Sequence, residues 1–113
     1  MAFDVQSHVT GNTAIMTLEG ELDGAAAPAF RSGIEALAGG AEIERLVLML
    51  GDLSYMASAG LRALVFAKQK LGGDVELVLV ATQESVAETI EMTGFHHSVT
   101  MVDSYDTGER AGE

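Results

Sequence analysis

Two short, nearly continuous apolar runs constrain the fold of this chain more than any other feature of its sequence. They are residues 45–50 (RLVLML) and 75–80 (VELVLV). Runs of this kind are typical of strands that are buried on both faces of a parallel sheet. Each run precedes a segment with apolar residues at helical spacing, at 58–71 and 84–93. Strands that alternate with helices favour parallel pairing, so we expect an α/β domain.

The flanking segments add a hairpin, a helix and a short strand. Residues 3–9 and 13–19 contain many β-forming residues and are separated by the turn sequence TGN, which predicts a β-hairpin. A helix is expected from residue 26 or 27 to residue 39, because Pro28 is tolerated only in the first turn. Residues 98–102 predict a final short strand. The expected order is therefore β-β-α-β-α-β-α-β.

These elements predict a single domain over residues 1–102, with a mixed four- to five-stranded sheet and helices packed mainly on one face. The length of 113 residues suits one hydrophobic core. Residues 51–57 are expected to form a loop between a strand and the next helix. Residues 103–113 are acidic and contain glycine, so a flexible C-terminal tail is expected there.

The charge balance restricts the partners that the chain is expected to have. It has 17 acidic and 6 basic side chains and a formal net charge of -11. Such a surface repels the phosphates of nucleic acids and anionic membranes, so we expect neither as a partner. A basic protein surface would be attracted, because opposite charges steer encounter. The charge alone is equally consistent with simple solubility.

Further classes are excluded by residues that the sequence lacks. There is no cysteine, which excludes disulfides, Cys-ligated zinc and thiol catalysis and suits a reducing compartment. The first residues show no basic and apolar pattern of a signal peptide, and no apolar run reaches the roughly 20 residues of a membrane helix. The chain is expected to be soluble and cytoplasmic.

The segment from Leu50 to Arg62 carries most of the functional information. A buried strand leads through a short connection into a helix, and Ser58 stands where the helix should begin. Serine is a favoured N-cap, so capping alone would explain Ser58. A helix N-terminus also has free N–H groups and a partial positive charge, which suit a phosphate. Phosphorylation of Ser58 would add about -1.5 to -2 charges without unfolding the helix.

A second candidate, Asp23, also follows an expected strand. If the strands before Asp23 and Ser58 are neighbours, the two residues share one edge of the sheet. The alternative is that Asp23 serves only as a turn or helix-capping carboxylate.

Several segments together resemble one protein family. They are residues 20–23 (GELD), 46–50 (LVLML), 52–61 (DLSYMASAGL), 72–73 (GG) and 93–95 (TGF). In order and spacing they are similar to the STAS domain family, in particular to bacterial anti-sigma factor antagonists of the SpoIIAA type. The resemblance covers nearly the whole chain.

The resemblance implies a phosphorylation switch without catalysis by the chain itself. In such antagonists the serine at the position of Ser58 is phosphorylated by an anti-sigma factor that is a GHKL-type serine kinase, and a PP2C-type phosphatase restores it. The unphosphorylated form binds the kinase. We expect no cofactor and a monomer or weak homodimer. The expected partner-contact residues are Asp23, Gly24, Tyr55, Met56, Ala57, Ser58, Ala59, Gly60, Leu61 and Arg62.

Two positions depart from the family pattern. Ala57 stands where an aspartate usually precedes the serine, and Ala26 stands where a threonine often caps the first helix. The missing cap is expected to cost about 1 kcal/mol.

Other functions have weaker support in the sequence. His96 and His97 are adjacent and lack further ligands, so no metal site is expected. There is no G-x-S-x-G motif for a hydrolase and no glycine-rich phosphate loop for ATP. Two alternatives keep the STAS fold: a switch that relays a kinase signal to a pathway without a sigma factor, such as secretion or biofilm formation, or a domain that senses a small ligand.

Overall fold

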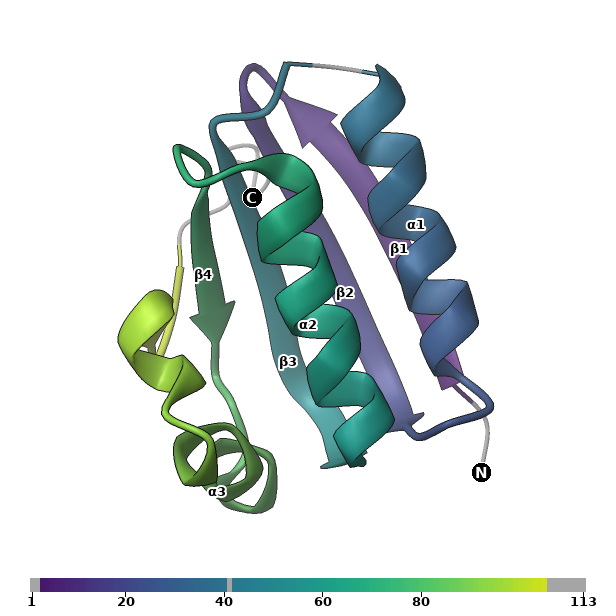
Figure 1. Cartoon of the computed structure of the whole chain (residues 1–113), viewed down its shortest axis with the longest axis vertical. Helices are drawn as coiled ribbons and strands as arrows, with labels where there is room; N and C mark the ends of the chain where they lie inside the picture. Colours follow the sequence, from purple (N-terminus) through teal and green to yellow (C-terminus); the bar gives the residue numbers. More distant parts are fainter. Residues whose placement is uncertain (1–2, 41, 106–113) are drawn as a thin grey trace, which may run out of the picture.

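The fold is a five-stranded mixed sheet with three α-helices, as expected from the sequence. The computed structural model describes residues 3–40 and 42–105. The strands lie in the order β1-β2-β3-β4-β5, with β1 and β2 antiparallel and all other neighbours parallel (Figure 1). The elements are β1 (Phe3–Thr10), β2 (Thr13–Leu22), α1 (Ala27–Gly40), β3 (Arg45–Met56), α2 (Ser58–Leu71), β4 (Glu76–Val80), α3 (Glu84–Met92), the 3-10 helix η1 (Phe95–Ser98) and β5 (Thr100–Val102).

The three α-helices contribute to one core on the same face of the sheet. Alternate residues of β3 (Leu46, Leu48 and Leu50) point into this core and are fully buried. Val47, between them, is fully buried in a smaller cluster with residues of β2 and β4. Both faces of the first part of β3 are therefore covered, which explains why residues 46–50 are continuously apolar. Each such leucine contributes roughly 2 kcal/mol of burial free energy.

The β1–β2 hairpin turns through two residues, Gly11 and Asn12. Gly11 has φ +62°, which is the left-handed value that the first position of a type II′ turn requires. The hairpin predicted around this turn is confirmed.

The prediction of a loop over residues 51–57 is wrong, because β3 continues to Met56. This extension lies beyond β4, which pairs only with residues 45–49, and its ladder partner is β2 alone. In the segment 51–56 every third residue is buried instead of every second, and the β2–β3 pairing shifts register twice. The shifts remove the alternation by which a strand is recognised in a sequence.

The chain after α3 also differs from expectation. Residues 95–98 form η1, so the final strand is shorter than the predicted 98–102. Residues 106–113 of the expected tail lie outside the described residues. None of the helices in the described ranges is long and apolar enough to cross a membrane.

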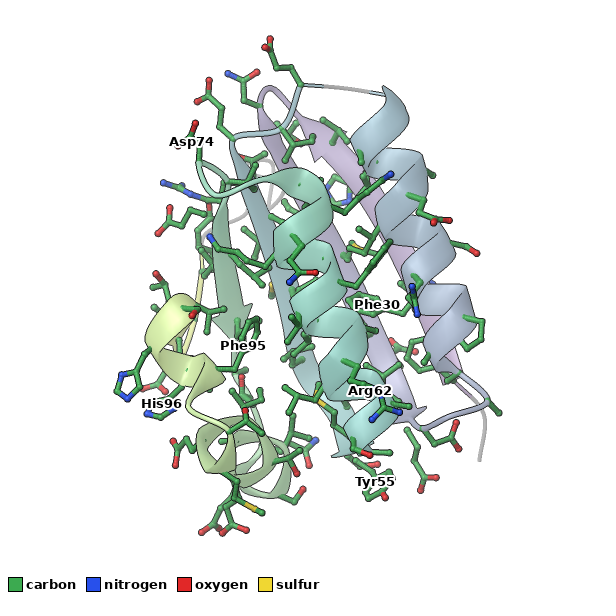
Figure 2. All side chains as sticks on the ribbon, viewed as in Figure 1. Phe30, Tyr55, Arg62, Asp74, Phe95 and His96 are labelled. Carbon is green, nitrogen blue, oxygen red and sulfur yellow. The ribbon has the colours of Figure 1, made fainter. Side chains whose placement is uncertain are left out.

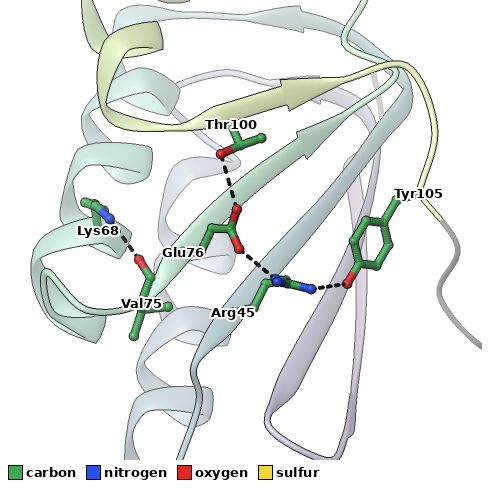
Figure 3. Close-up of polar contacts among 6 residues, drawn as sticks. All are labelled: Arg45, Lys68, Val75, Glu76, Thr100 and Tyr105. Carbon is green, nitrogen blue, oxygen red and sulfur yellow. Dashed lines mark hydrogen bonds and ion pairs between the residues drawn. The ribbon is translucent and has the colours of Figure 1, made fainter.

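A polar network holds the described part of the chain after β5 to the sheet (Figure 3). Arg45 donates from Nη1 to the hydroxyl of Tyr105 at 3.0 Å and from Nε to Glu76 at 2.8 Å. These two contacts, the Tyr105 hydroxyl first, raise the pKa of Arg45. The Thr100 hydroxyl lies 3.3 Å from the second oxygen of Glu76, which joins β5 to the network.

Candidate functional site

Asp23 and Ser58 lie at the same edge of the sheet, where the parallel strands β2 and β3 end (Figure 1). Leu22 and Met56 are partners in the parallel ladder. The backbone N–H of Ala57 donates to the carbonyl of Leu22 at 3.0 Å. The next residues along the two strands are therefore neighbours, and the predicted shared edge is confirmed.

The structure makes Ser58 the first residue of α2 and not its N-cap, which corrects the sequence-based prediction. The N-cap is Ala57, whose extended backbone (φ -80°, ψ 170°) continues the pairing with Leu22. No side chain caps the helix. In the described ranges the exposed hydroxyl of Ser58 has no hydrogen-bond partner. Capping therefore does not account for a serine at this position.

Gly60 fixes the start of α2 against the end of β2. A Cβ atom at Gly60 would lie 2.7 Å from both the carbonyl oxygen and Cγ of Leu22. Gly60 is buried, and so are Met56 and Leu61 on either side of the helix start. These three members of the expected contact set are therefore buried in the structure and offer little surface to a partner.

Asp23 accepts hydrogen bonds from the turn that leads into α1. Its Oδ1 accepts from the N–H of Ala26 at 2.9 Å, and its carbonyl accepts from the N–H of Ala27 at 2.9 Å. The side-chain bond is that of a turn carboxylate, one of the interpretations given for Asp23, and it leaves the expected partner contact of Asp23 a prediction. The two bonds satisfy the N–H groups of Ala26, just before α1, and of Ala27, its first residue.

The accessible surface of this edge is formed by the other expected contact residues. Tyr55, Ser58, Arg62 and Gly24 are exposed, with Tyr55 exposed to 49%. Asp23, Ala57 and Ala59 are half-buried. Tyr55 and Arg62 lie at the same end of the molecule, opposite Asp74 (Figure 2). The Ser58 hydroxyl, the Tyr55 ring and the Arg62 guanidinium group are therefore all accessible to a partner.

Three side-chain hydrogen bonds brace the extension of β3 that leads to Ser58. Ser54 donates to the carbonyl of Gly20 at 3.1 Å. From the start of α3, Gln83 donates to the carbonyl of Gly51 at 2.8 Å and Ser85 to that of Ser54 at 3.2 Å. These residues were not among the predicted site residues, because the bonds join segments about 30 positions apart and carry no local motif.

Two observations on the described residues bear on a metal or small-molecule site. No group of three or more His, Asp or Glu side chains among them could hold a metal ion. The rings of His96 and His97 contact each other, with centroids 4.0 Å apart. A hollow of about 560 Å³ at the opposite edge is lined by Asn12, Thr13, Glu44, Arg45, Asp74 and Glu76. Its lining is polar, unlike the mostly apolar pockets that hold small ligands.

Comparison with known proteins identifies the fold family. A search of curated protein sequences finds no match. Among solved structures, an anti-sigma factor antagonist from Mycobacterium paratuberculosis is 23% identical, with a TM-score of 0.83 over 93% of this chain and 89% of that one. The Bacillus protein SpoIIAA in its phosphorylated form is 21% identical, with a TM-score of 0.72 over 95% of each chain. Unphosphorylated SpoIIAA is also 21% identical, with a TM-score of 0.73 over 95% of this chain and 93% of that one.

These likenesses show a common fold. The model of the STAS domain matches residues 4–108, which is nearly all of the chain. The chain therefore belongs to the STAS domain family.

Proposed function

We propose that this chain is an anti-sigma factor antagonist that acts in a bacterial cytoplasm as a phosphorylation switch. Unphosphorylated, it binds an anti-sigma factor that is also a GHKL-type serine kinase, and phosphorylation of Ser58 releases it. One observation carries the proposal: the hydroxyl of Ser58 is exposed and without a partner among the described residues, at a braced edge that also holds Asp23.

The chain is the substrate of this reaction and not the catalyst. The Ser58 Oγ attacks the γ-phosphorus of ATP held by the kinase, and the bond from that phosphorus to the β,γ-bridging oxygen breaks. ADP leaves, and the hydroxyl proton passes to a base of the kinase. Hydrolysis by a PP2C-type phosphatase returns the hydroxyl. The chain needs only to present Ser58 in a fixed place, which the contacts of Gly60 and the bracing of β3 support.

Phosphorylation is expected to change the surface and not the fold. The phosphorylated and unphosphorylated forms of SpoIIAA match this chain almost equally, with TM-scores of 0.72 and 0.73. A phosphate on Ser58 would change the net charge from -11 to about -13, concentrated at the start of α2. A partner surface that accommodates an uncharged hydroxyl would then face a buried, doubly charged group, which costs several kcal/mol.

The test is phosphorylation by candidate GHKL kinases with ATP, read by intact mass. We expect the gain of one phosphate, abolished in Ser58→Ala and retained in Ser54→Ala, which removes another exposed serine of the same segment. Ser58→Asp should weaken kinase binding, and Ser58→Ala should preserve it. A phosphate that persists in Ser58→Ala, or equal affinities for the two Ser58 variants, would contradict the proposal.

A further inference from the structure

We propose that Arg62 binds the phosphate on Ser58 within the same chain, so that phosphorylation removes both a hydroxyl and a free cation from the partner-binding edge. The inference rests on the proposed phosphorylation of Ser58 and adds a residue that binds the phosphate. It concerns the phosphorylated state only, in which Arg62 acts on the group attached to Ser58.

The spacing of the two residues suits this contact. Ser58 is the first residue of α2 and Arg62 is four positions later in the same helix. Side chains at this spacing are neighbours on the helix surface, with Cβ atoms about 5–6 Å apart. Both side chains are exposed. The planar guanidinium group can donate two parallel hydrogen bonds to phosphate oxygens.

Arg62 is also available, unlike most of the cations that the structure describes. Arg31 lies over the ring of Phe66 at 4.4 Å, Arg45 is bonded to Glu76 and Tyr105, and Lys68 donates to the carbonyl of Val75 at 2.8 Å. In the described ranges Arg62 has no hydrogen bond or ion pair. An unpaired arginine beside Ser58 is notable in a chain with a net charge of -11.

The start of α2 leaves room for the phosphate. The first turn has no acidic side chain, and the N-cap Ala57 provides no capping group. The first N–H groups of the helix can therefore donate to phosphate oxygens from one side while Arg62 donates from the other. A carboxylate at position 57 would compete for Arg62 and repel the phosphate, so alanine at this position favours the contact.

The contact would make the switch act through two changes at once. The unphosphorylated edge presents the Tyr55 ring, the Ser58 hydroxyl and the Arg62 cation, and tyrosine and arginine are the residue types that dominate binding energy at interfaces. The phosphorylated edge presents an ion pair with net negative charge. A partner that had paired an acidic group with Arg62 would lose that pair and meet a like charge instead.

The test uses phosphoserine incorporated directly at position 58 during synthesis, without any kinase. Phosphorus NMR then follows the second ionisation of the phosphate against pH. A nearby cation favours the dianion, so the midpoint in the parent protein should lie about 0.5 pH unit below that in Arg62→Gln. Lys70→Gln is the matched control, because Lys70 is an exposed cation of the same helix about 18 Å along the axis from Ser58.

We expect the titration midpoint of Lys70→Gln to equal that of the parent protein. The midpoint of Arg62→Lys should lie between those of the parent and Arg62→Gln, because an ammonium group keeps the positive charge but cannot donate two parallel hydrogen bonds as a guanidinium group does. Equal midpoints in the parent and Arg62→Gln would overturn the inference. Because no kinase takes part, that result would leave the proposed phosphorylation of Ser58 intact. Conversely, a failure of every kinase to modify Ser58 would not change the titration.

Discussion

The two halves of β3 are held in place by different means. Residues 45–49 lie between β2 and β4, and apolar side chains cover residues 46–48 on both faces. Residues 51–56 pair only with β2, bury one residue in three, and depend on hydrogen bonds from Ser54, Gln83 and Ser85. The first half contributes apolar burial to the core, and the second half leads directly into Ser58.

The difference separates the stability of the fold from the precision of the site. Burial in a packed core is worth several kilocalories per mole per side chain, whereas an exposed hydrogen bond is worth about 1 kcal/mol or less. Substitutions of the buried residues in 46–50 should therefore lower the free energy of unfolding of the whole domain. Substitutions that remove contacts of residues 51–58 with β2 or α3 should act mainly on the local order of this segment while the core remains folded.

The largest effect is expected in the first half. Leu48 is fully buried among α-helical and strand side chains, so Leu48→Ala should lower the free energy of unfolding by about 3 kcal/mol. Urea denaturation measures this change. Asp52→Ala, an exposed position in the second half, is the control and should change stability by less than about 0.5 kcal/mol. Equal costs for the two variants would remove the contrast between the halves.

The next effect is at the junction of the second half with α2. A Cβ at Gly60 would lie 2.7 Å from the carbonyl oxygen of Leu22, so Gly60→Ala should displace the helix start and cost about 1–3 kcal/mol. Gly39 in α1 has nothing within 4 Å of the added atom. Gly39→Ala should therefore stabilise the protein by about 0.5–1 kcal/mol, because alanine is the better helix former.

Thermal unfolding of the two alanine variants measures this difference in sign. Gly60→Ala should also slow phosphorylation of Ser58, whereas Gly39→Ala should not. If both variants were stabilised, the close approach of α2 to Leu22 would not constrain the helix.

What the sequence could predict follows the same division. The continuous apolar run of residues 45–50 identifies a strand buried on both faces, and parallel strands place Asp23 and Ser58 at one edge. The extension to Met56 could not be predicted, because register shifts replace alternation with burial of every third residue. Ser58 was expected to be the N-cap of its helix, but it is the first helical residue. The N-cap is Ala57, because the hydrogen bond of its backbone N–H to Leu22 continues the strand pairing up to that residue.

The residues that brace the site were missed for a physical reason. Gln83 and Ser85 act on backbone carbonyls of a distant strand, and such bonds depend on how α3 docks and not on local sequence. The turn bond from the N–H of Ala26 to Asp23 was one of two open interpretations of Asp23, and its role as a partner contact stays a prediction.

A smaller effect is expected when a brace from α3 is removed. Gln83→Ala deletes the 2.8 Å bond to the carbonyl of Gly51 and should cost about 0.5–1 kcal/mol of global stability. Its main effect should be local, with faster amide hydrogen exchange over residues 51–57 and unchanged exchange over 46–50. Thr89→Ala is the control, because its hydroxyl bonds within α3 to Ser85 at 3.3 Å and does not reach β3. Unchanged exchange in Gln83→Ala would show that the ladder with β2 alone holds the second half.

The smallest effect is expected for the brace on the other side. Ser54 donates to the carbonyl of Gly20 at 3.1 Å, but it is exposed, and water can replace the lost donor. Ser54→Ala should therefore change the free energy of unfolding by less than about 0.5 kcal/mol and leave phosphorylation of Ser58 intact. Combined with Gln83→Ala, it should speed hydrogen exchange over residues 51–57 more than the sum of the two single changes, because both bonds restrain the same segment. Strictly additive effects would mean that the two bonds restrain the segment independently of each other, and this would contradict the prediction that they act together.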